Sequence, residues 1–293
     1  MAKAVWDFPT TRALIDAVRQ RPTLRRLCGW ETLGEVPSEA TFSRAFAAFA
    51  ADELAQQIHD ATIQQRYGEK IAGHVSRDAT AVEAREKAAK KKPQEPSDLP
   101  AAANAAQAGE AAEPTRMERQ LERSLEENLE DLPRECDGGT KKNSKGKRQG
   151  WRGYKLHADV IDGDIPVSWA LTSASLHDSQ AAIPLAQMSA ERVTSLYDLA
   201  DAAYDAKAIR ESSARLGHVA LIDHNPRRGE KREFAPAEAV RYRERSAAER
   251  VFSHLHDNHG GRHVRVRGAV KVAAHLSFGL LVIAAEQLLK LLC

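Results

Sequence analysis

The segment RYRERSAAERVFSHLHDN, residues 241–258, places four polar side chains on one face of a predicted helix. Steps of three, four and seven residues return to the same helical face. The resulting stripe comprises Tyr242, Arg245, Glu249 and His256. A phenol, a guanidinium, a carboxylate and an imidazole in this arrangement can contact one polar ligand. The alternative is an ordinary surface ion pair between Arg245 and Glu249, which contributes roughly a few tenths of a kcal/mol.

Two aspartates are expected to lie close to Glu249 in the folded chain. HVSRDATAV, residues 74–82, is predicted to form a strand that contains Asp78, and SLYDLAD is predicted to form a strand that ends at Asp201. In open α/β sheets the functional crevice lies near the carboxyl ends of strands, where a helix can cover it. We therefore expect Asp78, Asp201 and Glu249 to converge.

Three converging carboxylates repel one another unless cations neutralise them. Oxygen ligands with access to solvent suit Mg²⁺ or Mn²⁺ rather than zinc. Two such ions about 3.5–4 Å apart can activate a water or a 3′-hydroxyl and stabilise the leaving oxygen of a phosphodiester. The pattern thus predicts phosphoryl transfer on DNA. Each carboxylate also has a structural alternative: Asp78 ends a strand, Asp201 belongs to a turn, and Glu249 pairs with Arg245.

The second half of the chain predicts the elements that position these carboxylates. YKLHADVI and IPVSWALTSA are expected to be strands joined by Asp162-Gly163, a strong hairpin signal. Helices and strands then alternate, with Asp178 and Asp205 as candidate N-caps of two of the helices. Together with the strand of residues 74–82, this order predicts a mixed α/β sheet rather than an all-parallel one.

The amino-terminal part is predicted to be a small α-helical module, because apolar positions recur at helical spacing from residue 10 to 66. GEVPSEATFSRAFAAF has a Pro-Ser start signal before a short amphipathic helix, which fits the second helix of a helix-turn-helix. Plain helix packing explains the same pattern, because the helix has little positive charge apart from Arg44.

Residues 86–150 differ from the rest in being poor in aromatic residues and rich in Ala, Pro and charge. Such a stretch cannot bury enough apolar surface to offset the cost of ordering it, so we expect most of it to be disordered. An amphipathic helix is expected within it, over residues 117–132.

A basic run crosses the end of this insert. Its Lys and Arg residues alternate with glycines and aromatic residues, which is typical of a ribbon that contacts phosphates, although a solvated linker end is the alternative. The residues are Lys141, Lys142, Lys145, Lys147, Arg148, Arg152 and Lys155.

Overall composition limits the function classes. The formal net charge is only +2, so affinity for a polyanion must come from local patches. Cys28, Cys136 and Cys293 lie far apart without CxxC spacing, which argues against a zinc site and a disulfide framework and fits a reducing cytoplasm. The apolar stretch 273–292 contains charged residues and is predicted to be a buried terminal helix rather than a membrane anchor.

Five segments together resemble the DDE transposases of bacterial insertion sequences, in the group that carries a Tyr-Arg-Glu-Lys signature. They are SRDATAVEAREK, GTKKNSKGKRQGWRGYKLHADV, TSASLHDSQAAIPL, YDLADAAYDA and RYRERSAAERVFSHLHD. The resemblance implies a ribonuclease-H-like fold in which Asp78, Asp201 and Glu249 form the acidic triad and hold Mg²⁺ or Mn²⁺, as two ions. It also implies DNA cleavage and strand transfer by a homo-oligomer on the element's terminal inverted repeats and target DNA.

The resemblance gives the stripe of the opening helix a role. Arg245 is expected to fork onto one phosphate and Tyr242 to donate its hydroxyl to another. His256 stands where the family pattern has Lys, and we expect it to face phosphate as well.

We therefore expect an α-helical module at 1–70, which is a candidate for DNA binding, a ribonuclease-H-like catalytic domain at 71–85 and 151–293, and a charged insert at 86–150. The leading interpretation is a metal-dependent transposase in the cytoplasm. The alternatives are a nuclease that only hydrolyses DNA with the same triad, and a truncated or domesticated DNA-binding protein without turnover.

Overall fold

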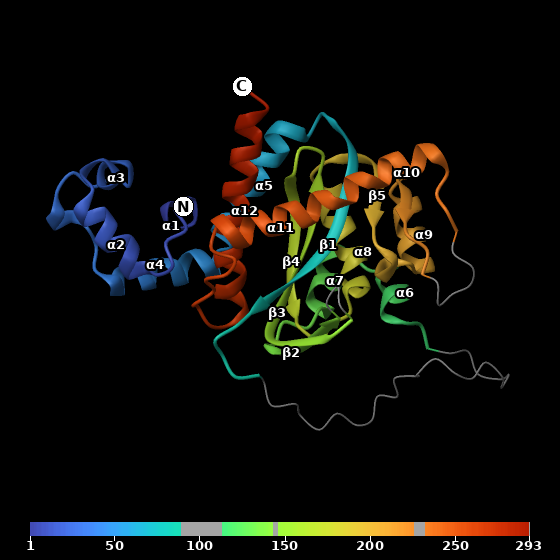
Figure 1. The fold of residues 1–293 in the computed structure, drawn as a ribbon, viewed down its shortest axis with the longest axis horizontal. Helices are drawn as coiled ribbons and strands as arrows, with labels where there is room; N and C mark the ends of the chain where they lie inside the picture. Colours follow the sequence, from blue (N-terminus) through green and yellow to red (C-terminus); the bar gives the residue numbers. More distant parts are fainter. Residues whose placement is uncertain (89–112, 143–145, 226–231, 293) are drawn as a thin grey trace.

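The computed structural model describes residues 1–88, 113–142, 146–225 and 232–292, and its centre is a six-stranded mixed sheet in the order β2-β3-β1-β5-β6, with β4 paired to β3 (Figure 1). β1 runs antiparallel to β3 and parallel to β5. The strands are β1 (Ile71–Glu83), β2 (Asp137–Lys142), β3 (Arg148–Ile161), β4 (Ile165–Ser173), β5 (Thr194–Ala200) and β6 (Val219–Ile222). This mixed α/β sheet flanked by helices confirms the predicted fold class.

Helices cover both faces of the sheet. α11 (Ser246–Asn258) and α12 (Ala269–Lys290) share one hydrophobic core with β1, β3 and β4. α8 (Ala182–Ala190) and α9 (Lys207–Arg215) pack into a second core with β5 and β6. Because side chains alternate between the two faces of a strand, neighbouring residues of β1 meet different helices.

The apolar C-terminal stretch forms α12, which is long and apolar enough to cross a membrane by length and composition. In this structure 67% of its most apolar window is buried inside the protein. Val272, Leu276 and Leu280 belong to the core shared with α11. The stretch is therefore a buried core helix, as its sequence predicted.

The hairpin predicted at Asp162-Gly163 joins β3 to β4. Gly163 and Asp164 both adopt positive φ, 81° and 60°, which the short turn requires. Asp162 accepts hydrogen bonds from the backbone N–H groups of Gly73 and His74, at 2.8 and 3.1 Å. The turn thereby holds the beginning of β1 in register.

The amino-terminal helices extend to one side of the sheet (Figure 1). They are α1 (Ala2–Val5), α2 (Thr11–Gln20), α3 (Pro22–Leu27) and α4 (Glu39–Ala51), whereas α5 (Leu54–Tyr67) packs against the sheet through Ile63. The Ser38 side chain accepts from Thr41 N–H and caps α4, so the predicted start signal is confirmed. Residues 28–38, which include the 3₁₀ turn η1 (Leu33–Glu35), separate α3 from α4 by more than the three- to four-residue turn of a helix-turn-helix. Phe46 of α4 packs on Phe278 of α12, with ring centroids 6.4 Å apart, so helix packing explains this segment.

Part of the predicted insert is folded. Residues 113–142 form α6 (Arg116–Gln120), α7 (Leu125–Asp131) and β2, so the helix expected over 117–132 is two short helices. Thr115 and Ser124 each begin one of them with a capping box. The Asn128 side chain donates to the Gln187 side chain of α8 at 2.9 Å, which fastens α7 to the sheet's helical layer. Residues 89–112 and 143–145, and the disorder expected there, lie outside the described residues.

Two predicted helix caps are wrong. Asp178 forms an ion pair with Lys155, with Nζ 2.7 Å from Oδ1, and His177 instead caps the 3₁₀ turn η2 (Asp178–Ala181). Asp205 binds the Arg210 guanidinium at 2.9 Å, and α9 begins two residues later. In both cases the carboxylate binds a cation instead of the N–H groups of the helix that it was predicted to cap.

Candidate active site

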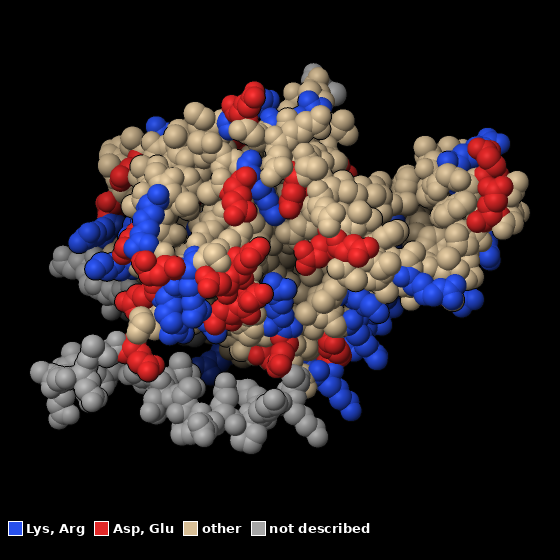
Figure 2. Space-filling model, turned by 180° about the vertical axis from the view of Figure 1, so that it is seen from behind, with Lys and Arg blue, Asp and Glu red and all other residues tan. Residues whose placement is uncertain are grey.

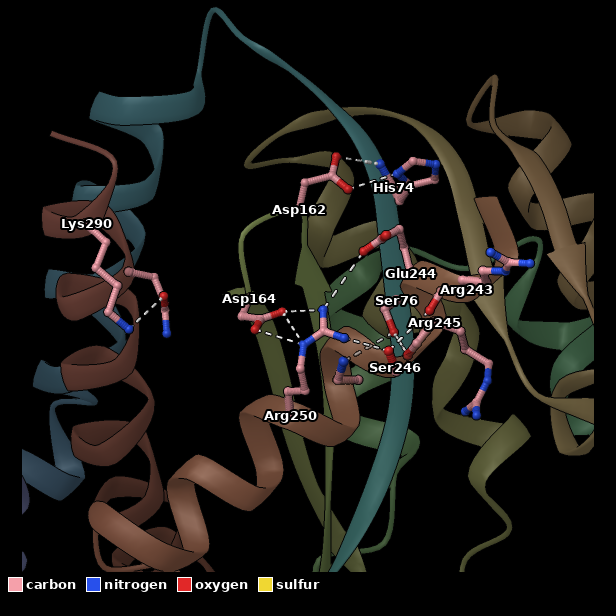
Figure 3. Close-up of polar contacts among 12 residues, drawn as sticks. His74, Ser76, Asp162, Asp164, Arg243, Glu244, Arg245, Ser246, Arg250 and Lys290 are labelled. Atoms are coloured by element: carbon pink, nitrogen blue, oxygen red, sulfur yellow. Dashed lines mark hydrogen bonds and ion pairs between the residues drawn. The ribbon is translucent and has the colours of Figure 1, made fainter. Parts of the chain in front are cut away.

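One face of β1 lies directly under α11. The Ser76 hydroxyl donates to the carbonyl of Arg245 and accepts from the N–H of Ala248 at 3.3 Å (Figure 3). The Thr80 hydroxyl lies 3.2 Å from Nε2 of His256, in the last turn of the helix. Asp78 is between Ser76 and Thr80 on the same face of the strand. Its carboxylate therefore faces α11 as well.

Asp201 is the neighbour of Asp78 on the adjacent parallel strand. Ser76 pairs with Leu199 in the β1–β5 register, and each aspartate follows two residues later in its own strand direction. Asp201 directly follows β5 and accepts from the N–H of Ala203 at 2.8 Å, which fixes its carboxylate as the N-cap of the 3₁₀ turn η3 (Ala202–Tyr204). Asp78 therefore lies within β1, and Asp201 directly follows β5, the parallel neighbour of β1.

Glu249 lies in the first turn of α11 and is the most exposed of the three carboxylates, with 52% of its side chain accessible. Its Oε1 is 2.8 Å from Nη2 of Arg245. The surface ion pair considered for this helix therefore exists. The charge of Glu249 also acts on Asp78, so the same pair borders the group of carboxylates.

Electrostatics supports the grouping of the three acids. The pKa of Asp78 is raised to about 7, mainly by burial and also by the negative charges of Asp201 and Glu249, while the Ala79 N–H and Arg245 oppose the rise. A carboxyl group that resists ionisation beside two other carboxylates is typical of a functional site. All the candidate ligand atoms are carboxylate oxygens, which suit Mg²⁺ or Mn²⁺. A bound divalent cation would favour the ionised form of the Asp78 carboxyl group.

The stripe is not carried by one continuous helix. α10 (Pro236–Tyr242) ends at Tyr242, the 3₁₀ turn η5 (Arg243–Arg245) follows, and α11 begins at Ser246. The Tyr242 hydroxyl donates to the carbonyl of Ala200 at 3.3 Å, and the Arg245 guanidinium lies 5.9 Å from the Tyr242 ring centroid. Burial raises the pKa of Tyr242 to about 12. Tyr242 thus connects the helical segment to the end of β5 that precedes Asp201.

His256 does not lie free to meet a phosphate, contrary to our expectation. Its ring is half-buried and contacts the Thr80 hydroxyl. Burial lowers the pKa of His256, and Arg262 lowers it further, so the imidazole is held neutral. The imidazole instead helps to hold α11 on β1 through its contact with Thr80.

The predicted basic run forms the β2–β3 hairpin and its surroundings. The exposed members are Lys141, Lys147, Arg148 and Arg152. Lys142 belongs to β2, and Lys145 lies outside the described residues. Lys155 is a correction, because its ammonium donates to the Leu176 carbonyl at 2.6 Å and to Asp178 at 2.7 Å inside the protein.

Sequence reasoning missed the residues that fix β1 from its other face. Arg77 is 3% exposed and binds Asp159 of β3 through two hydrogen bonds, at 2.8 and 2.7 Å. The Ser189 hydroxyl of α8 donates to the same carboxylate at 2.7 Å. The signal was present in SRDAT, where Arg77 precedes Asp78 and must point to the opposite face.

α11 is also fastened at its exposed side. The Arg250 guanidinium forks onto Asp164 of the β3–β4 turn, with Nε 2.9 Å from Oδ2 and Nη2 2.7 Å from Oδ1 (Figure 3). A bidentate pair fixes direction as well as distance. Together with Ser76 and Thr80, Arg250 therefore sets where the first turn of α11 presents Glu249.

The family comparison agrees with this geometry. The family model described as Transposase DDE domain matches residues 73–284, more than two thirds of the chain, and this range includes Asp78, Asp201 and Glu249. The chain belongs to the transposase DDE-domain family. Its mixed sheet and flanking helices are consistent with a ribonuclease-H-like fold. Comparison with curated proteins and with solved structures found no significant match.

Proposed function

We propose that this protein is a transposase that cleaves DNA at the ends of an insertion sequence and joins the freed 3′ ends to target DNA. The observation that carries the proposal is the position of Asp78. It lies on β1 under α11, next to the parallel strand β5 that leads into Asp201, and its pKa is raised to about 7, mainly by burial and also by two further carboxylates. Such a site favours a divalent cation over bare carboxylates.

Asp78, Asp201 and Glu249 would hold the metal. One or two Mg²⁺ or Mn²⁺ ions, when bound, supply activation of the attacking water or 3′-hydroxyl and stabilisation of the leaving oxygen. Asp78 lies on β1, and Asp201 directly follows β5, the parallel neighbour of β1. Glu249 would turn from Arg245 toward the metal, and this would free the guanidinium, 24% exposed in its present pair, to bind a phosphate oxygen of the DNA backbone.

We propose duplex DNA as the partner, as terminal inverted repeats and as target, bound by a homo-oligomer in the cytoplasm. Acidic and basic side chains are interspersed on the face seen in Figure 2, so that face offers no broad basic surface. Phosphate contacts are instead assigned to the exposed cations of the β2–β3 hairpin, Lys141, Lys147, Arg148 and Arg152, and to Arg245. Lys155 and His256 are not included because both are partly buried.

The test uses a labelled duplex that carries the inverted repeat flanking the gene, with Mg²⁺ or Mn²⁺. Asp78→Asn, Asp201→Asn and Glu249→Gln should each lower the cleavage rate by at least on the order of 1000-fold, since the metal contributes several kcal/mol to the transition state. DNA binding should change little. Glu244→Gln is the matched control. Glu244 is an exposed acidic residue of the adjoining 3₁₀ turn, and its ion pair with Arg250 is long, at 3.9 Å.

Three results would contradict the proposal in different ways. Full cleavage by any one triad variant would show that the wrong ligand has been named. Cleavage by the unmodified protein without joining to target DNA would indicate a hydrolytic nuclease. DNA binding without cleavage at any tested Mg²⁺ or Mn²⁺ concentration would indicate a DNA-binding protein without turnover.

A further inference from the structure

A second group of metal-binding side chains lies at the other end of α11. His254 is on α11, His259 directly follows it, and Glu286 is on α12. The two Nε2 atoms are 3.3 Å apart, and Oε2 of Glu286 lies 3.6 Å from His254 Nε2 and 3.4 Å from His259 Nε2. The ligand atoms of these three residues all lie within 4.8 Å of one another, which is close enough for them to bind one metal ion.

The three separations match the edges of a tetrahedral zinc site. Zinc binds histidine nitrogen at about 2.0–2.1 Å and carboxylate oxygen at about 2.0–2.2 Å. Tetrahedral ligands at these bond lengths lie about 3.3–3.6 Å from one another. The observed distances of 3.3, 3.4 and 3.6 Å fall in this range without any movement of the helices.

Hydrogen bonding prepares His259 to be a ligand. Its Nδ1 lies 3.1 Å from the carbonyl of Ala4, which can only accept, so Nδ1 carries the proton. The Nε2 lone pair of the neutral ring then points at His254 and Glu286. Metal-binding histidines usually have such a carbonyl partner on the other ring nitrogen. When both rings are neutral, Nε2 of His254 is the one atom of the three that can carry a proton. The contact between Nε2 of His259 and Oε2 of Glu286 then joins two acceptors, which a metal ion between them would satisfy.

We propose that His254, His259 and Glu286 bind one Zn²⁺ ion, with water at the fourth position. Imidazole and carboxylate suit zinc, whereas the all-carboxylate site around Asp78 suits harder cations. An entry path exists, because the side chains of His254 and Glu286 are 28% and 37% exposed while His259 is buried. The spacing of the cysteines argued against a zinc site, but the ligands of this site are histidines and a glutamate.

The site would connect three parts of the fold. A metal at this position joins the end of α11 to α12, and the His259–Ala4 hydrogen bond continues the connection to α1. Glu249 lies on the same helix, more than one turn before His254. Zinc therefore fastens the helix that presents the third catalytic carboxylate, and it stabilises the folded state because the unfolded chain does not hold the three ligands together.

The experiment measures Zn²⁺ binding by full-length protein freed of metal with a chelator. Calorimetric titration with Zn²⁺ is carried out in excess Mg²⁺, which occupies carboxylate sites and competes weakly for imidazole. We expect one equivalent of zinc to bind. His254→Ala and Glu286→Gln should each weaken binding by at least roughly 100-fold, since loss of even an outer partner costs about 10–100-fold. Asp78→Asn should still bind one equivalent, which separates this site from the triad.

The matched control is His263→Ala, because His263 is a nearby, partly exposed histidine outside the cluster. Saturating Zn²⁺ should raise the Tm of the unmodified protein, of His263→Ala and of Asp78→Asn, but not of Glu286→Gln. If Glu286→Gln and the unmodified protein have equal Tm values without metal, the variant is folded. Absence of zinc binding in excess Mg²⁺, unchanged affinity in both ligand variants, or loss of binding in Asp78→Asn would each overturn the proposal, whatever the outcome of the cleavage assays.

Discussion

Ionisation of Asp78 lowers the stability of the metal-free folded protein. Its pKa of about 7 lies above the ordinary value of 3.8, so the folded state holds this proton more tightly than the unfolded state does. The associated stability is complete below the unfolded pKa and is lost as pH rises through about 7. A group kept at such a cost is typical of a site selected for function.

Asp78→Asn should therefore stabilise the metal-free protein at pH 8, by on the order of 1–3 kcal/mol, because the variant has no buried charge to form. Near pH 4 the gain should vanish. Urea unfolding with a chelator present, at both pH values, measures the difference. An equal loss of stability at both pH values would mean that Asp78 is a structural residue.

His157 has the opposite linkage. Burial lowers its pKa to about 4, and its Nε2 lies 2.8 Å from the Thr172 hydroxyl. The unfolded state binds a proton near pH 6.5 that the folded state refuses, so stability falls as pH drops from 6.5 to 4, by about 1.4 kcal/mol per pH unit for this one proton.

His157→Gln keeps a polar partner for Thr172 and removes the titration. The variant should lose less stability than the unmodified protein between pH 7 and pH 5, even if it is less stable at pH 7. Chemical denaturation at the two pH values measures both slopes. Parallel slopes would show that His157 does not contribute to the acid sensitivity.

At the scale of elements, the seating of α11 on β1 decides where Glu249 lies. The Ser76 hydroxyl bridges the Arg245 carbonyl and the Ala248 N–H. Ser76→Ala leaves both backbone groups without this partner, which should cost about 1–2 kcal/mol of unfolding free energy. Cleavage should fall more than DNA binding, since Glu249 loses its position. Ser253→Ala, on the exposed face of the same helix, is the control, and equal effects of the two variants on cleavage would refute the positioning role.

His256 gives a second prediction for the same helix. A lysine at this position would bring an ammonium into a half-buried site near Arg262 and Lys141, and would lose the Thr80 contact. We expect His256→Lys to lower the free energy of unfolding by on the order of 1–2 kcal/mol. Tighter binding of DNA with unchanged stability would restore the idea that this side chain faces phosphate. Thermal unfolding and an affinity titration on one preparation decide between the two.

Elements with strong local signals were predictable, and elements that depend on distant partners were not. The β3–β4 hairpin follows from Asp162-Gly163, and the alternation of strands and helices predicted the mixed sheet in which β1 and β5 are neighbours. β2 was missed because Gly138-Gly139 and the lysines after it are typical of a linker. The strand forms against β3, where Trp151 lies so close to Gly139 that a Cβ there would be 2.4 Å from a ring atom.

The candidate site shows the same division. Spacing along one segment placed Arg245 near Glu249, and the structure has them 2.8 Å apart. The partners of Arg77 and Lys155 could not be predicted from the sequence, because Asp159 and Asp178 reach them through sheet pairing and loop closure. The caps expected at Asp178 and Asp205 failed for the same reason.

At the scale of the whole molecule, the low net charge makes the β2–β3 hairpin the test of non-specific DNA affinity. Replacement of Lys141, Arg148 and Arg152 by Gln should reduce the slope of log affinity against log salt by about 0.9 for each phosphate that the hairpin no longer binds, up to about 3 units. The control replaces Lys207, Arg215 and Lys271, which are exposed elsewhere, with the same change in net charge. Equal slopes for the two triple variants would reduce the hairpin's role to that of overall charge.

The central position of β1 also has a consequence in time. β1 is complete once residue 83 has been synthesised, but α11, which covers its Asp78 face, ends at Asn258. At about 5–20 residues per second, a ribosome needs roughly 9–35 s to add the residues between them. Throughout that interval the nascent chain exposes the Asp78 face of the strand without its helix, and α12 is added later still. The three carboxylates of the proposed triad can therefore come together only after α11 has been synthesised.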